Sequence, residues 1–187
     1  MKKYFIIILG LILVLTSLAH AQGVTKVGTT AAAFLGIDVG SRGTGMGSAY
    51  VSVVNDATAM YWNSAGIAQL DAVELSLCAS TWLADMTVNY AGIVIPGGNY
   101  GNFGINATFL TMDEMERTTI AKPDGTGEMF DAGFYTFGIS YARKLTDLFA
   151  IGFNGKYINE TIYHSSAHGF ALDVGALYKT RFGLDLG

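Results

Sequence analysis

The stretch FALDVGALY (residues 170–178) decides the fold class, because two kinds of side chain alternate along it. One set of alternate positions is apolar and consists of Phe170, Leu172, Val174, Ala176 and Tyr178, and the other holds Ala171, Asp173, Gly175 and Leu177. Successive side chains of a β-strand point to opposite faces of its sheet. The period of two therefore predicts a strand with one apolar face.

The same alternation recurs in residues 73–80, 103–109, 135–142 and 149–157, and in a blurred form in residues 88–95. These stretches predict six strands, and RFGLDLG (181–187) is a candidate for the start of a seventh. Turn-forming residues at 96–99 and 145–147 alternate with longer polar loops at 112–128 and 160–168. Short connections at one end and long ones at the other predict an all-β, antiparallel up-and-down sheet.

The second face of these strands is polar but almost uncharged. It carries mainly Gly, Ser, Thr, Ala and Asn, and only 14% of the whole chain is charged. A solvated surface would hold roughly 25–35% charged residues. Aromatic residues stand near both ends of four strands, as the pairs Phe103 and Phe109, Tyr135 and Tyr141, Phe149 and Tyr157, and Phe170 and Tyr178. This pattern is typical of an outer-membrane β-barrel with aromatic girdles and favours lipid contact over a secreted two-sheet sandwich.

The first 21 residues have the features of a secretory signal peptide. Lys2 and Lys3 precede an apolar run over residues 4–18, and Ala19-His20-Ala21 offers a small-x-small cleavage site. The apolar run of about 15 residues is shorter than the roughly 20 that a transmembrane helix needs. We therefore expect export, with bacterial outer-membrane lipid as the surroundings of the mature chain.

Three segments are predicted from these patterns: a signal peptide (1–21), an N-terminal segment (22–72) and barrel strands (73–187). Six strands are fewer than the even number of at least about eight that a membrane barrel needs. The end of the chain, Leu186-Gly187, also lacks a terminal aromatic residue. We expect the N-terminal portion of a longer barrel, forming an open, curved sheet around the N-terminal segment.

The glycine-rich stretch GSRGTGMGSAYVSVVNDATAMYWNSAGIA (40–68) does not have the spacing of a nucleotide site. Its glycines read G-x-G-x-G rather than G-x-G-x-x-G, and no Gly-Lys-Ser/Thr follows. The stretch resembles instead the N-terminal segment of the PorV/PorQ group within the FadL-type superfamily of outer-membrane barrels. The likeness rests on Gly40-Ser41-Arg42, Gly45-Met46-Gly47, Asp56-Ala57 and Tyr61-Trp62-Asn63-Ser64-Ala65-Gly66. The group usually has proline where this chain has Ser64.

The resemblance implies that residues 22–72 fold into the barrel as a plug. Within the PorV/PorQ group it implies a component of protein secretion, type IX-like, whose partners are secretion proteins or cargo. The wider superfamily implies passive uptake of hydrophobic small molecules such as fatty acids. A secreted binding or structural β-protein is a third alternative. None of these functions is enzymatic, and none requires a cofactor or a catalytic residue.

Ten residues are candidates for functional contacts. The ligand or plug candidates are Arg42, Asp56, Trp62, Asn63 and Ser64, and the predicted lumen-facing polar residues are Glu74, Asn106, Asn154, Lys156 and Asp173. For Arg42 an ion pair with the lumen wall is favoured over a substrate clamp, and for Asn63 a turn-capping role over a gate. Glu74, Lys156 and Asp173 are expected to pair with each other or with Arg42.

Other chemistry has little support in the sequence. A net charge of −4 gives no basic surface for nucleic acid. His164 and His168 lie four apart in a loop without a neighbouring cysteine or carboxylate, so no metal site is expected. The single cysteine, Cys78, excludes an internal disulfide and is expected to point inward as a small buried residue.

Overall fold

The protein is described here by a computed structural model in which residues 32–187 are defined. The predicted signal peptide (1–21) and the first ten residues of the predicted N-terminal segment lie outside the described residues. Within the described residues, no helix has the length and apolar character needed to cross a membrane.

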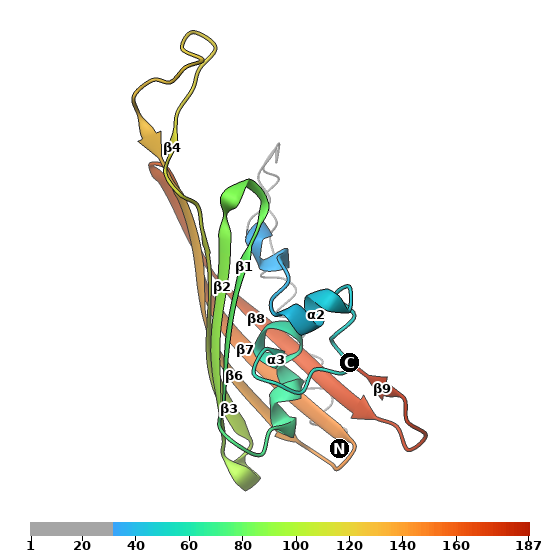
Figure 1. The fold of residues 1–187 in the computed structure, drawn as a ribbon. Coiled ribbons are helices and arrows are strands. Elements are labelled where there is room, and N and C mark those ends of the chain that lie inside the picture. Colours follow the sequence, from blue (N-terminus) through green and yellow to red (C-terminus); the bar gives the residue numbers. More distant parts are fainter. Residues whose placement is uncertain (1–31) are drawn as a thin grey trace, which may run out of the picture. The chain divides into compact units, whose positions relative to one another are not determined.

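Six long strands and one short strand form a single antiparallel sheet in which each strand pairs with the next one along the chain (Figure 1). The strands are β1 (Glu74–Thr81), β2 (Thr87–Pro96), β3 (Asn102–Thr111), β6 (Ala132–Lys144), β7 (Phe149–Ile162), β8 (Ser165–Lys179) and β9 (Asp185–Leu186). The predicted all-β class, the six strands and the start of a seventh are confirmed. The sheet is open, with β1 at one edge and β9 at the other.

Among the connections between paired strands, the one between β3 and β6 is long (Figure 1). The predicted polar loop over residues 160–168 is wrong, because β7 extends to Ile162 and β8 begins at Ser165, which leaves residues 163–164 as a tight turn. At the end that we call the turn end, β2 and β3 are joined through η4 (Gly98–Tyr100), and β6 and β7 through residues 145–148. At the opposite, loop end, β1 and β2 are joined through η3 (Leu83–Asp85). The loop between β3 and β6 contains a two-stranded hairpin, β4 (Met115–Glu116) and β5 (Met129–Phe130), which extends well beyond the sheet.

One face of the sheet, which we call the outer face, carries the apolar set of alternate positions. Ile139 is 72% exposed, Leu172 70% and Phe137 50%. The intervening residues of the same strands are covered, for example Ser140 and Asn154, which are both fully buried. The predicted segregation of side chains between two faces is therefore present, and the apolar set lies on the uncovered side.

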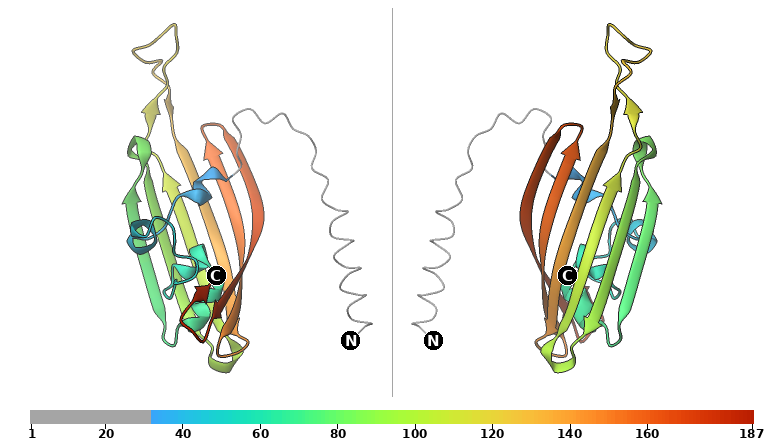
Figure 2. Two further views of the ribbon diagram at one scale, coloured as in Figure 1. Left: turned by 90° about the vertical axis from the view of Figure 1, so that its right-hand side faces the viewer. Right: turned by 90° about the vertical axis from the view of Figure 1, so that its left-hand side faces the viewer.

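The other face, which we call the inner face, is covered by the N-terminal segment, defined here as residues 32–73 (Figure 2). This segment contains η1 (Ala33–Gly36), α2 (Ser41–Gly45), α3 (Ala59–Trp62) and η2 (Ser64–Gln69). Its apolar side chains supply most of a buried cluster, including Tyr50, Val54, Met60 and Ile67, to which the strands add Val94, Ala142, Ala150 and Leu177. The main hydrophobic core thus lies between this segment and the sheet.

Strand β2 explains the one blurred alternation in the sequence. Val88, Tyr90 and Val94 face inward and are buried against the N-terminal segment and its surroundings. Ile95 faces outward and is exposed. Because β2 has apolar residues on both faces, no period of two is visible along it.

Candidate functional site

The contact between the inner face and the N-terminal segment is the candidate site. Helix η2 packs against β3, β6, β7 and β8, so it lies across the middle of the sheet. Two inward glycines allow its backbone to approach this closely. A β-carbon at Gly152 would lie 2.4 Å from the backbone nitrogen of Ala65, and one at Gly175 would lie 2.2 Å from Oδ1 of Asn63. No side chain fits at either position without displacing the segment.

Asparagine side chains on the inner face bind carbonyl oxygens of the segment. The amide nitrogen of Asn154 donates to the carbonyl of Met60 at 2.9 Å. Asn102 donates to the carbonyls of Ile67 and Leu70, both at 2.7 Å. Irregular backbone away from water needs such partners, because an unpaired buried carbonyl is costly. These two side chains therefore replace the hydrogen bonds that a longer helix would have made for itself.

Two further strands bind the segment at Ala57. The hydroxyl of Tyr90 on β2 donates to the Ala57 carbonyl at 2.8 Å, and Oε1 of Glu74 on β1 accepts from the Ala57 amide at 2.9 Å. Both backbone groups of this residue are thus satisfied by the sheet. Glu74, predicted to pair with a cation, accepts a backbone hydrogen bond instead.

A chain of polar side chains crosses the inner face beneath the segment. Asn106 contacts Ser140 and Asn154, both at 3.4 Å, and Asn154 in turn contacts Asp173 at 3.4 Å. Asp173 forms an ion pair with Lys156 at 2.6 Å, and the Lys156 side chain is only 11% exposed. All the predicted lumen-facing residues lie on the inner face, and four of them belong to this chain.

The Asn63 side chain makes three hydrogen bonds, which connect the N-terminal segment to β8. Its Oδ1 accepts from the backbone amide of Ala65 at 3.1 Å and thereby caps η2. Its Nδ2 donates to the carbonyls of Val51 at 3.0 Å and of Ala176 on β8 at 2.9 Å. Asn63 is therefore a capping and docking residue, with its amide fully engaged.

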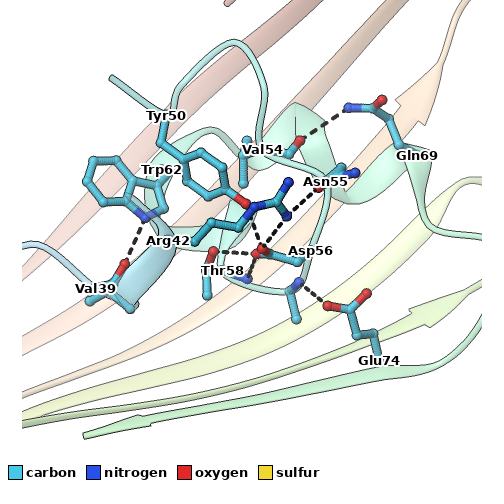
Figure 3. Close-up of polar contacts among 11 residues, drawn as sticks. Val39, Arg42, Tyr50, Val54, Asn55, Asp56, Thr58, Trp62, Gln69 and Glu74 are labelled. Atoms are coloured by element: carbon cyan, nitrogen blue, oxygen red, sulfur yellow. Dashed lines mark hydrogen bonds and ion pairs between the residues drawn. The ribbon is translucent and has the colours of Figure 1, made fainter. Parts of the chain in front are cut away.

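Asp56 organises the middle of the N-terminal segment (Figure 3). Its carboxylate accepts from the Tyr50 hydroxyl at 2.6 Å, from the Thr58 amide at 2.9 Å and from the Thr58 hydroxyl. Arg42 lies 3.5 Å from the same carboxylate and donates to Asn55 at 2.9 Å. The expectation that Arg42 pairs with the wall or with the charges of the sheet is wrong. An acidic partner 14 positions along the same segment is nearer, and the pair stays on the exposed side of that segment.

Aromatic residues fix the packing of the same region. Trp62 donates from Nε1 to the Val39 carbonyl at 3.0 Å. The Tyr61 hydroxyl shares its one proton between the carbonyls of Leu35 at 2.9 Å and Ile37 at 3.0 Å. Burial, together with the nearby Asp38 carboxylate, raises the pKa of Tyr61 to about 12. The pKa of Tyr50 is raised to about 12, mainly because the phenol is buried and next because it donates a hydrogen bond to the Asp56 carboxylate. Both phenols are held in the neutral form at ordinary pH.

Ser64 adjoins Asn63 and packs against Gly175. Its hydroxyl is buried without a hydrogen-bond partner among the described residues. A β-carbon at Gly175 would lie 3.1 Å from that hydroxyl.

Three open cavities border the N-terminal segment, and polar side chains line each of them. A cavity of about 410 Å³ lies between Asp71, Asn102, Arg143 and Lys144. A second, of about 240 Å³, is lined by Gln69, Lys144, Asp147 and Lys179. The third, of about 350 Å³, lies between Trp62, Asn63, Lys156 and Asp173. A fully apolar depression is present on the outer face, between Leu75, Ile93, Ile105, Phe137 and Ile139.

The Tyr163 side chain joins the neighbouring β7–β8 turn to the long hairpin, in which two side chains pair with each other. Arg117 pairs with Glu128 at 2.7 Å, and the Tyr163 hydroxyl donates to the same carboxylate. The hydrogen bond from Tyr163, and then that from Arg117, lowers the pKa of Glu128. The hairpin tip bears Ile120, whose side chain is fully exposed.

Two contact residues were missed from the sequence, Tyr90 and Asn102. Asn102 has the same parity as the inward residues Gly104 and Asn106, so extending the alternation by one step would have placed it on the inner face. Tyr90 lies in the strand with the blurred alternation and carried no comparable signal.

No known protein-family model matches this chain, and no curated protein matches it either. Its fold and the contacts described above therefore carry the functional argument.

Proposed function

We propose that this chain is an outer-membrane β-barrel protein whose N-terminal segment closes the barrel interior, and that it serves in protein secretion rather than as a passive channel. The observation that carries the proposal is the exposed outer face. Leu75, Ile105, Ile139, Leu172 and Val174, on β1, β3, β6 and β8, are each at least 59% exposed. In the strand register, Ile93 on β2 and Gly155 on β7 lie between them on the same face. So large an apolar surface would cause aggregation in water but suits the lipid of a bilayer.

Aromatic rings at both ends of this apolar band support the same orientation. Towards the loop end, five rings form a continuous row, with neighbouring centroids 5.4–6.5 Å apart: Phe109, Phe137, Tyr135, Tyr157 and Phe170. Towards the turn end, Phe103 lies 5.1 Å from Tyr141, and Phe149 lies 6.5 Å from Tyr178. Along β8, the eight steps from Phe170 to Tyr178 rise roughly 20 Å at a strand tilt of about 40°, close to the apolar height of a membrane barrel.

The filled inner face favours secretion over transport of hydrophobic molecules. A fatty-acid channel needs an apolar pocket between plug and wall, whereas the cavities bordering the segment are lined by charged and amide side chains. The segment is also bound to the sheet through Glu74, Tyr90, Asn102 and Asn154. A segment fixed in this way suits a carrier that presents partner-binding surfaces.

The hairpin between β3 and β6 is the surface best placed for such a partner. It projects past the loop end, is braced by Arg117, Glu128 and Tyr163, and exposes Ile120 at its tip. The resemblance to the PorV/PorQ group of secretion components agrees with this assignment.

The proposal is tested by deleting the gene and following secretion and fatty-acid uptake in the same cells. We expect secreted proteins to accumulate in the periplasm while uptake stays normal, and a plasmid copy to restore secretion. Loss of uptake with normal secretion would instead establish the FadL-type alternative. The location is tested separately by finding the protein in the outer-membrane fraction after washing with alkaline carbonate.

A further inference from the structure

Positive charge gathers at the turn end of the sheet. Arg143, Lys144, Lys179 and Arg181 lie at the ends of β6 and β8 or directly after them, and we call these residues the basic rim. The loop end carries mostly negative charge. Among residues 32–187, its acidic residues are Asp85, Asp113, Glu114, Glu116, Asp124, Glu128, Asp131 and Glu160, and its only lysine and arginine are Lys122 and Arg117.

The cations of the basic rim are not used to hold the fold together. In residues 32–187, the lysines and arginines in ion pairs are Arg42, Arg117 and Lys156. No residue of the basic rim has a carboxylate oxygen within 4.0 Å in the same part of the chain. Asp71, Asp147 and Asp185 are the acids nearest to it in the sequence and the turns; they number three against four cations, and none of them forms an ion pair with the rim.

The basic rim also has a cavity that can receive a headgroup. Arg143 and Lys144 line the open cavity of about 410 Å³ together with Asn99, Asn102 and Asp71. Lys144 also lines the adjoining cavity with Lys179. At this opening two positive charges and an amide donor outnumber the single carboxylate of Asp71, which favours an anion such as a phosphate group.

The neighbouring side chains indicate that this phosphate belongs to a lipid. Tyr100 and Phe182 are each 81% exposed beside the rim, and the Tyr141 hydroxyl donates to the Tyr100 carbonyl. Tyrosine and phenylalanine beside basic side chains are typical of the boundary between acyl chains and headgroups. A dissolved phosphate ion has no apolar part that could contact these aromatic rings.

We propose that the basic rim binds the phosphate of anionic phospholipids, with Arg143 and Lys144 supplying two of the positive charges. This inference rests on the proposed membrane location and goes beyond it, because it names the lipid class and the residues that select it. The rim would fix the depth of the turn end in its leaflet through charge as well as through apolar contact.

The test uses the full chain purified in an uncharged detergent and exposed to equal amounts of phosphatidylglycerol and phosphatidylcholine. Native mass spectrometry then counts the lipids that remain bound. We expect phosphatidylglycerol to be retained preferentially. The double variant R143Q/K144Q should reduce that preference by roughly fivefold for each charge removed, the weight of one basic residue near an anionic surface.

Two control variants separate charge from folding. K122Q removes an equally unpaired cation from the opposite end and should keep the preference. R143K/K144R keeps both charges and should also keep it, and circular dichroism should show the same β-content in all variants. Equal retention of the two lipids by the unaltered chain overturns the inference.

The source of the phosphate and the membrane location are tested by separate arms. If millimolar inorganic phosphate displaces phosphatidylglycerol, the rim is a site for free anions and the lipid assignment is wrong. If the chain inserts into phosphatidylcholine vesicles but shows no lipid preference, only this inference fails. If it does not insert into vesicles of either composition, the proposed function fails.

Discussion

The side-chain amide of Asn154 on β7 donates to the backbone carbonyl of Met60, 94 positions earlier in the chain, at 2.9 Å. Asn154 is fully buried, and the same side chain contacts Asn106 and Asp173. This one amide therefore joins the N-terminal segment to the polar chain that crosses the inner face.

Replacing Asn154 with alanine should destabilise the protein by about 1–3 kcal/mol, because the Met60 carbonyl stays buried without a donor. The measurement is urea unfolding in detergent micelles. Asn159→Ala on the same strand is the matched control, since Asn159 is only partly buried and accepts a single weak hydrogen bond, from Thr161. Equal effects of the two substitutions would contradict the anchoring role.

Gly152→Ala should detach the N-terminal segment, because the new β-carbon would lie 2.4 Å from the Ala65 nitrogen. Overpacking of this kind costs roughly 1–3 kcal/mol when the surroundings cannot move away. The readout is faster trypsin cleavage after Arg42 in the folded protein. Gly155→Ala, three positions along β7, has no atom within 4 Å of its β-carbon and should leave cleavage unchanged.

The lipid-facing assignment predicts different surroundings for two adjacent residues of β8. In a Cys78→Ser background, a spin label at Leu172→Cys should be accessible to oxygen dissolved in the bilayer. A label at Ala171→Cys should face the interior and show little oxygen contact. Electron paramagnetic resonance in vesicles measures both, and equal accessibility at the two positions would refute the assignment.

Alkaline titration should show that Tyr50 and Tyr61 ionise far above the usual tyrosine pKa of about 10. Tyr50 and Tyr61 have a folded-state pKa of about 12, so the unfolded chain loses these protons first as pH rises. Their contribution to stability is complete below pH 10 and is lost between pH 10 and 12. Absorbance at about 295 nm follows phenolate formation. Tyr61→Phe should remove one late transition, and a titration without late transitions would contradict the burial of these phenols.

Shortening the hairpin between Met115 and Met129 to a tight turn should abolish secretion without affecting membrane assembly. The sheet register between β3 and β6 does not depend on β4 and β5, which pair only with each other. Secretion and the amount of protein in the outer membrane are measured in the same strain. Normal secretion with the shortened hairpin would exclude it as the partner surface.

The strands could be predicted from sequence because period-two alternation is a local property. Phe170 and Leu172 reveal the outer face within a single strand, whatever the rest of the chain does. Strand β2 shows where this signal fails. Val88, Tyr90 and Val94 are apolar because the N-terminal segment covers them, and that contact depends on residues about 30 positions away.

The partners of individual side chains were less accessible to sequence reasoning. Lys156 on β7 and Asp173 on β8 form an ion pair, which is one of the pairings predicted among the inward-facing charged residues. For Arg42 an ion pair with the lumen wall was predicted, whereas the local fold of the N-terminal segment brings Asp56 to it. The hydrogen bonds from Asn102 and Asn154 depend on how η2 crosses the sheet, and no local pattern encodes that crossing.

The hydrogen bond between Asn63 and the Ala176 carbonyl has a consequence for the order of folding. It spans 113 positions, and its acceptor belongs to the last long strand. The N-terminal segment leaves the ribosome early, yet its docking surface is incomplete until β8 has paired with β7. The N-terminal segment is therefore synthesised before the sheet but docks after the sheet has formed. Until it docks, its apolar residues need protection from other chains.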